Sequence, residues 1–143
     1  MDRLVRDIMR IGVPTCTRES SLVQVAAMLA RDQVDALIVM DEYGACGVIS
    51  QSDLVRVYPR NYALLRAQDI MTERIVNIAP DTSVTAAANL MQEEHVHQVF
   101  IMHEHPGPSR PSAAMTMRAI VREMAGLEPE RVERKVLASH KQR

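Results

Sequence analysis

A serine and an aspartate three residues apart, Ser50 and Asp53, close the stretch GVISQSD, and side chains of these types at this spacing have two uses. They can cap a helix, because the serine oxygen accepts a backbone N–H and the acid bonds back to the cap residue. The same helix start offers N–H groups and positive potential to a phosphate. A carboxylate there can also accept hydrogen bonds from both vicinal hydroxyls of a ribose. The two residues alone leave both uses open.

The sequence repeats itself, so this stretch has a counterpart. With a shift of 62 residues, VRDIM (5–9) falls on AQDIM (67–71), and DALIVM (35–40) falls on HQVFIM (97–102). After the Pro- and Gly-rich stretch HEHPGPSRP, which is typical of a loop, the shift grows to 66. A unit of about 60 residues is too small to bury a large core alone, so we expect the two copies to pack together.

Apolar spacing predicts the elements that must position these residues. In the first copy it predicts a strand at 15–17, a helix capped by Ser20 or Ser21 and running to Ala30, a hairpin of strands 35–40 and 45–50, and a helix at 51–58. In the second copy it predicts a strand near 77–79, a helix at 83–94, strands from 97 and at 113–116, and a helix from 117. The expected fold is α/β, a β-α-β-β-α unit twice, whose small sheets face each other with flanking helices.

The repeat divides the chain into residues 1–60, 61–126 and a last segment, 127–143, which has no counterpart in the first copy. Pro129 in the last segment suits a first helical turn, so we expect a helical tail. The tail could pack on the body or on a second chain, or remain a solvated helix that frays.

Bulk composition limits the class of protein. The 143 residues suit one domain of ordinary size, and 47% hydrophobic residues suit a soluble globule with a core. A net charge of −1 provides no general attraction for nucleic acid or an anionic membrane, and no apolar run approaches a membrane span of about 20 residues. The charged first ten residues do not read as a signal peptide. Two cysteines make no disulfide framework, so we expect a reduced, cytoplasmic setting.

The element order, the DIM leader in both copies and GVISQSD together resemble the CBS domain, named after cystathionine β-synthase. Two such motifs in tandem look like a Bateman module, over roughly Leu4 to Gly126. The resemblance implies a pseudo-twofold module that binds an adenosine-containing ligand (AMP, ADP, ATP or S-adenosylmethionine) in a cleft between the motifs, and that pairs into a homodimer.

The resemblance also assigns roles to residues of the first copy. It implies Ser50 on the phosphate side and Asp53 on the ribose side of a nucleotide. It implies a slot for the base at the entry to the first strand and the start of the second; the matching positions are Val13, Pro14, Thr15, Cys16, Asp35 and Ala36. Neighbouring Leu37 we assign to the core, and Val13 and Ala36 could equally be ordinary core residues.

The second copy differs at the decisive position. GVISQSD becomes AAMTMRA (113–119), in which Thr116 keeps the cap hydroxyl and Ala119 replaces the aspartate. We therefore predict one competent nucleoside cleft and one impaired cleft, either phosphate-only or empty. The resemblance makes His97 a candidate for phosphate contacts, and Arg118 and Arg122 are further candidates because arginine suits fork contacts with phosphate. The ordinary alternative is that His97 is a partly exposed strand residue and the arginines are solvated.

Catalytic and metal motifs were not found. His97 and His103 would lie ~20 Å apart on a straight strand, too far for one ion, and His103 with His105 suits only adventitious metal. Cys16 has no adjacent base that would activate a thiolate. We therefore expect no enzyme and no metal, but a nucleotide-sensing regulatory module acting on an unknown partner protein. The alternatives are a ligand-free dimerisation or scaffold module and, less favoured, a metal or redox sensor.

Overall fold

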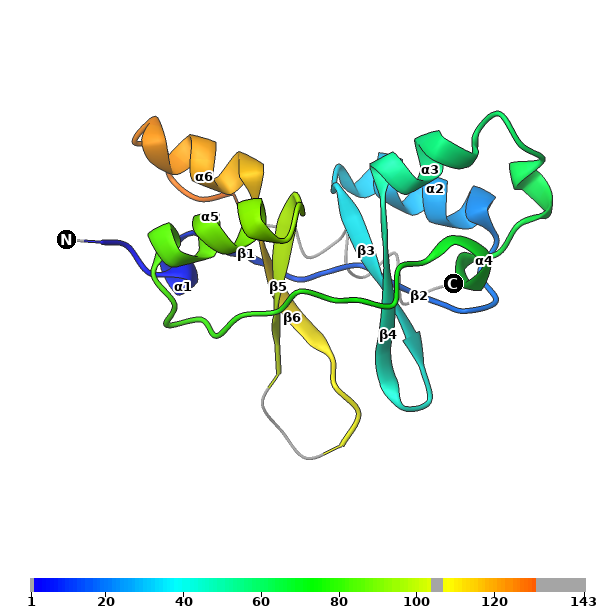
Figure 1. Cartoon of the computed structure of the whole chain (residues 1–143), viewed down its shortest axis with the longest axis horizontal. Helices are drawn as coiled ribbons and strands as arrows, with labels where there is room; N and C mark the ends of the chain where they lie inside the picture. The colour runs from blue at the N-terminus through cyan, green and yellow to red at the C-terminus, as the bar shows by residue number, and fades with distance from the viewer. Residues whose placement is uncertain (1, 104–106, 131–143) are drawn as a thin grey trace. The chain divides into compact units, whose positions relative to one another are not determined.

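The computed structural model describes residues 2–103 and 107–130, and it divides into two compact units (Figure 1). Unit 1 comprises Met1–Val13, Val76–Glu104 and Pro111–Arg143, and unit 2 comprises Pro14–Ile75 and His105–Arg110. Each unit has its own three-stranded sheet and its own apolar core.

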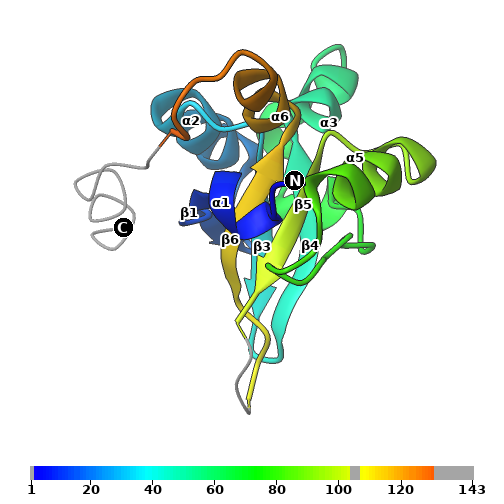
Figure 2. The same ribbon diagram turned by 90° about the vertical axis from the view of Figure 1, so that its left-hand side faces the viewer.

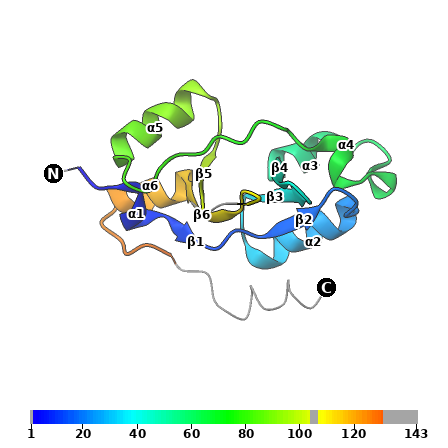
Figure 3. The same cartoon turned by 90° about the horizontal axis from the view of Figure 1, so that it is seen from below.

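Unit 2 is built on a sheet in the order β2 (Thr15–Thr17), β3 (Ala36–Asp41) and β4 (Gly44–Ser50). Strand β2 runs parallel to β3, beside which it lies in the view from below (Figure 3), and β4 returns antiparallel. The helical segments of this unit are α2 (Leu22–Asp32), α3 (Gln51–Val57), the 3₁₀ turn η1 (Tyr62–Leu64) and α4 (Ala67–Ile70).

Helix α2 shows how local sequence sets the packing of unit 2. Ser21 Oγ accepts the N–H of Gln24 at 3.1 Å, and Gln24 Oε1 accepts the N–H of Ser21 at 3.0 Å, so both helix-start donors are satisfied. The helix ends at Gln33, whose φ of 53° is left-handed. Between these ends, apolar side chains at helical spacing are buried with those of β3 and β4; the set includes Leu22, Val25, Leu29, Leu37 and Ile49.

Unit 1 is built on a sheet in the order β1 (Arg10–Ile11), β6 (Pro111–Thr116) and β5 (Gln98–Met102), all antiparallel. Its helices are α1 (Val5–Ile8), α5 (Val84–Glu93) and α6 (Met117–Met124). Figure 2 shows α1 and α5 against the strands of this sheet. The core joins α1, α5, β5 and β6 through Val5, Ile8, Val84, Ala87, Met91, Val99, Ile101, Ala113 and Met115.

The DIM leaders of the repeat form the two short helices α1 and α4, and the aspartate of each leader is a capping residue. Asp7 accepts the N–H of Leu4 at 3.0 Å, and Asp69 accepts the N–H of Arg66 at 2.7 Å. Each leader lies in the compact unit of the other repeat's hairpin: α1 with β5 and β6, and α4 with β3 and β4. The compact units therefore do not follow the sequence division at residue 60, which remains a prediction about the repeat.

The structure confirms the mixed α/β fold and nearly every predicted element, including β2 and the Ser21 cap of α2. The strand predicted near 77–79 is wrong as a regular strand. Only an isolated parallel bridge joins Asn77 to Phe100, although Ile78 N–H still bonds the Phe100 carbonyl at 2.9 Å. Pro80 follows, where the first repeat has Arg18, and a proline has no N–H to extend the ladder.

The predicted helical tail falls mainly on residues 131–143, outside the described residues. Leu127 to Glu130 are described, and they are not helical.

Candidate functional site

One end of the unit 2 sheet gathers most of the residues nominated for the first copy. Ala36 at the start of β3 pairs with Ser50 at the end of β4, and the Pro14 carbonyl before β2 accepts the N–H of Ile38 at 3.1 Å. The Asp35 carbonyl accepts the N–H of Gln51, the first residue of α3, at 2.9 Å. Pro14, Asp35, Ala36 and Ser50 therefore meet where two strands begin and a helix starts.

Ser50 and Asp53 form the predicted cap of α3. The Ser50 N–H donates to Asp53 Oδ2 at 2.8 Å, the Ser50 hydroxyl donates to the same oxygen at 3.0 Å, and Ser50 Oγ accepts the Asp53 N–H at 3.3 Å. The other carboxylate oxygen, Oδ1, accepts from Arg56 at 3.1 Å. Asp53 is only 8% exposed, whereas the Arg56 side chain is 70% exposed. Asp53 is therefore buried with carboxylate oxygen Oδ2 bonded within the helix cap and oxygen Oδ1 bonded to a solvated arginine.

The remaining first-copy candidates differ in exposure. Thr15 is exposed on β2, which is an edge strand in the described part of the sheet, while Val13 is half-buried. Cys16 faces the core, and burial raises the pKa of its thiol to about 11. Leu37 is fully buried in the unit 2 core, so its assignment to the core is confirmed.

The glycine that opens GVISQSD has a packing role. A Cβ on Gly47 would lie 2.6 Å from Met71 Sδ, which belongs to the second DIM leader. The missing side chain thus lets the leader lie against β4. The counterpart in unit 1 is Ala113, which is buried in the core without this restriction.

The equivalent end of the unit 1 sheet lacks an acid. Thr116 at the end of β6 caps α6, since its Oγ1 accepts the N–H of Ala119 at 3.1 Å, and the His97 carbonyl accepts the N–H of Met117 at 3.1 Å. Ala119 packs against the core instead of presenting a carboxylate. His97 is exposed at the start of β5, so the two nominated side chains lie on neighbouring strand ends.

The two nominated arginines of α6 already have partners in the chain segment that follows the helix. Arg118 donates from Nε to Glu130 Oε1 at 2.7 Å and from Nη2 to Glu130 Oε2 at 3.3 Å. Arg122 Nη2 donates to the Glu128 carbonyl at 2.7 Å. The Arg118 guanidinium lowers the pKa of Glu130 chiefly through this hydrogen bond, with smaller contributions from Arg122 and Arg10.

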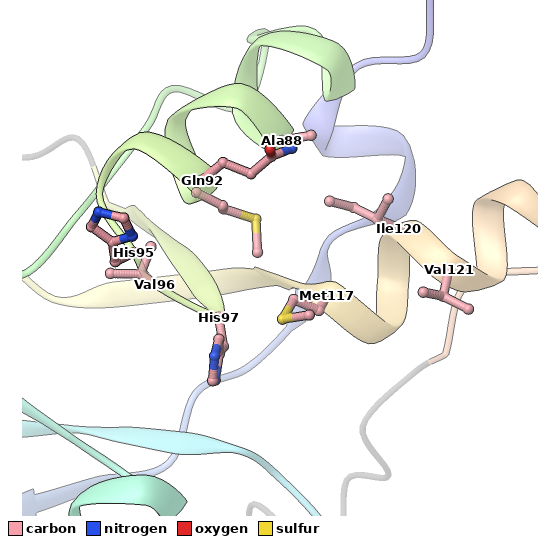
Figure 4. Close-up of a pocket in the computed structure, with 9 residues that line it drawn as sticks. Ala88, Gln92, His95, Val96, His97, Met117, Ile120 and Val121 are labelled. Atoms are coloured by element: carbon pink, nitrogen blue, oxygen red, sulfur yellow. The ribbon is translucent and has the colours of Figure 1, made fainter.

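A cavity of about 520 Å³ lies within unit 1, between α5 and α6 (Figure 4). Met117 and Ile120 of α6 face Ala88 and Gln92 of α5, and His97 lies at the edge of the group. The lining is mainly apolar, which suits a flat apolar body or an apolar side chain. Its residues are Ala88, Met91, Gln92, His95, Val96, His97, Met117, Ile120 and Val121.

Of these cavity residues, only His97 was predicted from the sequence as a site residue. Two polar residues that do not line the cavity, Gln98 and Glu130, were also missed. Gln98 Oε1 is buried and finds no hydrogen-bond partner among the described residues. A polar residue at the position that Ala36 has in the first copy was the available signal. Glu130 could not have been found from spacing, because it reaches Arg118 only after the chain reverses direction.

Within residues 2–103 and 107–130, no group of three or more His, Cys, Asp or Glu side chains could hold a metal ion. Among the helices described there, none has the length and apolar character to cross a bilayer.

Comparison with solved structures shows the same fold in several proteins. The CBS domain pair of protein MJ0100, solved in complex with 5′-methylthioadenosine and S-adenosyl-L-methionine, is 23% identical, with a TM-score of 0.72 over 88% of this chain and 98% of that one. A conserved protein from Pyrococcus horikoshii is 18% identical, with a TM-score of 0.75 over 91% and 97% of the two chains. A CBS domain-containing protein from Bacillus anthracis is 18% identical, with a TM-score of 0.69 over 87% and 94%.

No curated protein matches the chain. The CBS domain family model matches it twice, at residues 5–60 and 67–126, which together cover most of its length. With its two repeats, its paired leaders and its two small sheets, the chain belongs to the CBS domain family.

Proposed function

We propose that this protein is a non-catalytic regulatory module that binds an adenosine-containing ligand (AMP, ADP, ATP or S-adenosylmethionine) at the strand ends of unit 2. The observation that carries the proposal is the Asp53 carboxylate, buried at the start of α3 and replaced by Ala119 at the equivalent position of unit 1. The adenosine compounds bound by the CBS domain pair of MJ0100 support the ligand class.

The contacts of Asp53 are compatible with a sugar ligand. Oδ2 stays with Ser50, while Oδ1 accepts from Arg56, whose side chain is 70% exposed and can move into solvent. A small movement of Arg56 therefore frees one lone-pair-rich oxygen for ribose hydroxyls without opening the helix cap. The base would lie near the neighbouring strand starts, against Val13, Pro14, Thr15, Cys16, Asp35 and Ala36.

Unit 1 has a different part in the proposal. It lacks the ribose acceptor but keeps Thr116 at a helix start, with His97, Arg118 and Arg122 nearby in the unit. These groups suit phosphate oxygens rather than a sugar, because imidazole and guanidinium groups donate hydrogen bonds to anions. The proposed second site therefore takes phosphate alone or stays empty.

Regulation would follow from linkage. A bound ligand can change the protein only if it binds one conformational state more tightly than another, and a partner protein would respond to that shift. The partner is unknown. We place the protein in the cytoplasm, where thiols stay reduced, a setting that suits the free Cys16 and Cys46 of this chain.

Calorimetric titration tests the adenosine site. Adenosine, AMP and S-adenosylmethionine are titrated into the wild type, Asp53→Ala and Asp69→Ala. Asp69 is the matched control, because it caps α4 in the same unit as Asp53 caps α3. We expect at least one compound to bind, with Asp53→Ala weakening it about tenfold or more and Asp69→Ala leaving it unchanged. Equal binding by all three proteins, or no binding at all, contradicts the proposal.

A ligand-free scaffold is the second candidate, and one observation favours it. Within the described part of the chain, Asp53 makes its hydrogen bonds to its own helix and cap, which is what a purely structural aspartate would show. A stable dimer that ignores every adenosine compound would favour this candidate over the sensor.

The proposal includes a homodimer. Helix α6 exposes apolar residues at helical spacing, namely Met117, Val121 and Met124, and Leu127 follows them. The equivalent helix α3 exposes Val55 and Tyr58 at the positions that match Val121 and Met124 in the repeat. A second copy of the chain is the proposed cover, because the same pattern occurs in both halves.

A further inference from the structure

Two arginines of α6 hold the chain segment that ends at Glu130. Arg118 holds Glu130 through a two-pronged fork, and the positive charges of Arg122 and Arg10 also lower the pKa of Glu130. A planar guanidinium that binds both oxygens of a carboxylate presents the same geometry to two oxygens of a phosphate.

The chain segment after α6 is built to bring Glu130 to this place. Gly126 has a φ of +73°, which reverses the chain, and the Leu127 N–H bonds the Arg122 carbonyl at 3.0 Å. Pro129 favours an extended Glu128 before it. Four extended residues span about 13 Å, close to the roughly 12 Å length of an eight-residue helix, so the segment returns along α6 to its first turn.

We propose that Glu130 is an internal occupant of a phosphate-binding site formed by Arg118 and Arg122, and that a phosphate ligand binds there by displacing residues 127–130. The proposal deepens the phosphate part of the proposed function and does not depend on adenosine binding in unit 2. The Glu130 contact is displaceable, since the side chains of Arg118 and Glu130 are 65% and 40% exposed and solvent screens such a pair.

A second feature of the cluster shows spare donor capacity. Arg122 Nε is buried and has no hydrogen-bond partner among the residues that the structure describes. Its Nη2 donates to the Glu128 carbonyl, which belongs to the same returning segment. Displacement of that segment therefore exposes donors of both Arg118 and Arg122 to one ligand.

Inorganic pyrophosphate is the probe for this site, titrated calorimetrically into the full chain. Glu130→Gln keeps the size of the side chain and removes its charge, so we expect it to bind pyrophosphate roughly twofold to fivefold more tightly than the wild type. Glu128→Gln is the matched control, because only the backbone carbonyl of Glu128 contacts the cluster, and we expect no change. Arg118→Ala should weaken binding about tenfold or more.

A second readout follows the returning segment itself. In the wild type, pyrophosphate should shift the backbone amide resonances of Leu127 and Glu130, and in Glu130→Gln those resonances should already be displaced without ligand. The proposal is overturned if Glu130→Gln and the wild type bind pyrophosphate equally, or if neither binds it. Adenosine carries no phosphate, so its titration into Asp53→Ala tests the unit 2 site separately.

Discussion

At the scale of single residues, Asp53 has an observed role in folding and a proposed role in binding. Asp53 occupies the third position of α3, where its carboxylate stabilises the helix start, and Ala119 shows that an equivalent helix starts without it. The acid is therefore not required for a helix at this place. An alanine at position 53 should therefore test the proposed ligand binding while α3 still forms.

Cys16 gives a residue-scale prediction about redox chemistry. Burial raises the pKa of its thiol from the ordinary 9.0 to about 11, so at pH 8 it stays protonated and a poor nucleophile. We expect iodoacetamide at pH 8 to modify the half-buried Cys46 before Cys16, as measured by mass spectrometry of the folded protein.

The raised pKa of Cys16 also makes the free energy of unfolding depend on pH. The unfolded chain releases the Cys16 proton near pH 9 and the folded chain only near pH 11, so this group removes stability as the pH rises through that window.

In the alkylation experiment, modification of Cys16 as fast as Cys46 in the native protein would contradict a protonated, buried Cys16 thiol and would favour a redox role.

At the scale of elements, the leader helices decide how each sheet is completed. Residue Thr72, just after α4, bridges to Val48 of β4, while β1, just after α1, pairs with β6. The leader and the strand-like residue behind it act as one element that adds to a sheet edge. In unit 2 this packing depends on Gly47, because a side chain at that position would collide with Met71 of the leader.

The element-scale prediction concerns Gly47 and Met71. Gly47→Ala places a Cβ 2.6 Å from Met71 Sδ, and because a methionine side chain can move, we expect a loss of about 1–2 kcal/mol in unfolding free energy. In a Met71→Ala background the same change should cost clearly less. Gly44→Ala should cost more than Gly47→Ala, since Gly44 has a φ of +117° and faces the Ser109 backbone. Chemical denaturation measures all four variants, and additive losses at positions 47 and 71 would refute this explanation.

At the scale of the whole molecule, the proposed dimer has a direct test. Val121 is 60% exposed on α6, so Val121→Glu should fold normally and shift the protein from dimer to monomer in sedimentation velocity. Thr85→Glu, on the exposed surface of α5, is the control and should leave the oligomeric state unchanged. A wild type that sediments as a monomer at every concentration would remove the homodimer from the proposal.

The sequence by itself determined the repeat, the α/β class and the longer helices and strands, but not the short elements α1, β1, η1 and α4. These depend on local information: caps such as Ser21 with Gln24, apolar spacing, and a turn between two short apolar runs. It also located the difference between Asp53 and Ala119, because a repeat supplies its own internal comparison. The strand predicted near 77–79 was wrong, because Asn77 makes only an isolated bridge, and Pro80 in the sequence was the available signal against a strand.

Only the tertiary structure decided which pieces belong together. Nothing local in VRDIM or AQDIM indicates that each leader packs on the hairpin of the other repeat, because that choice depends on contacts between residues far apart in the chain. The same holds for Glu130, which meets Arg118 only because Gly126 reverses the chain and an extended segment matches the length of α6. Helices and strands are determined mainly by neighbouring residues in the sequence. The partner of a charged side chain is determined by which distant segment of the chain the fold brings next to it.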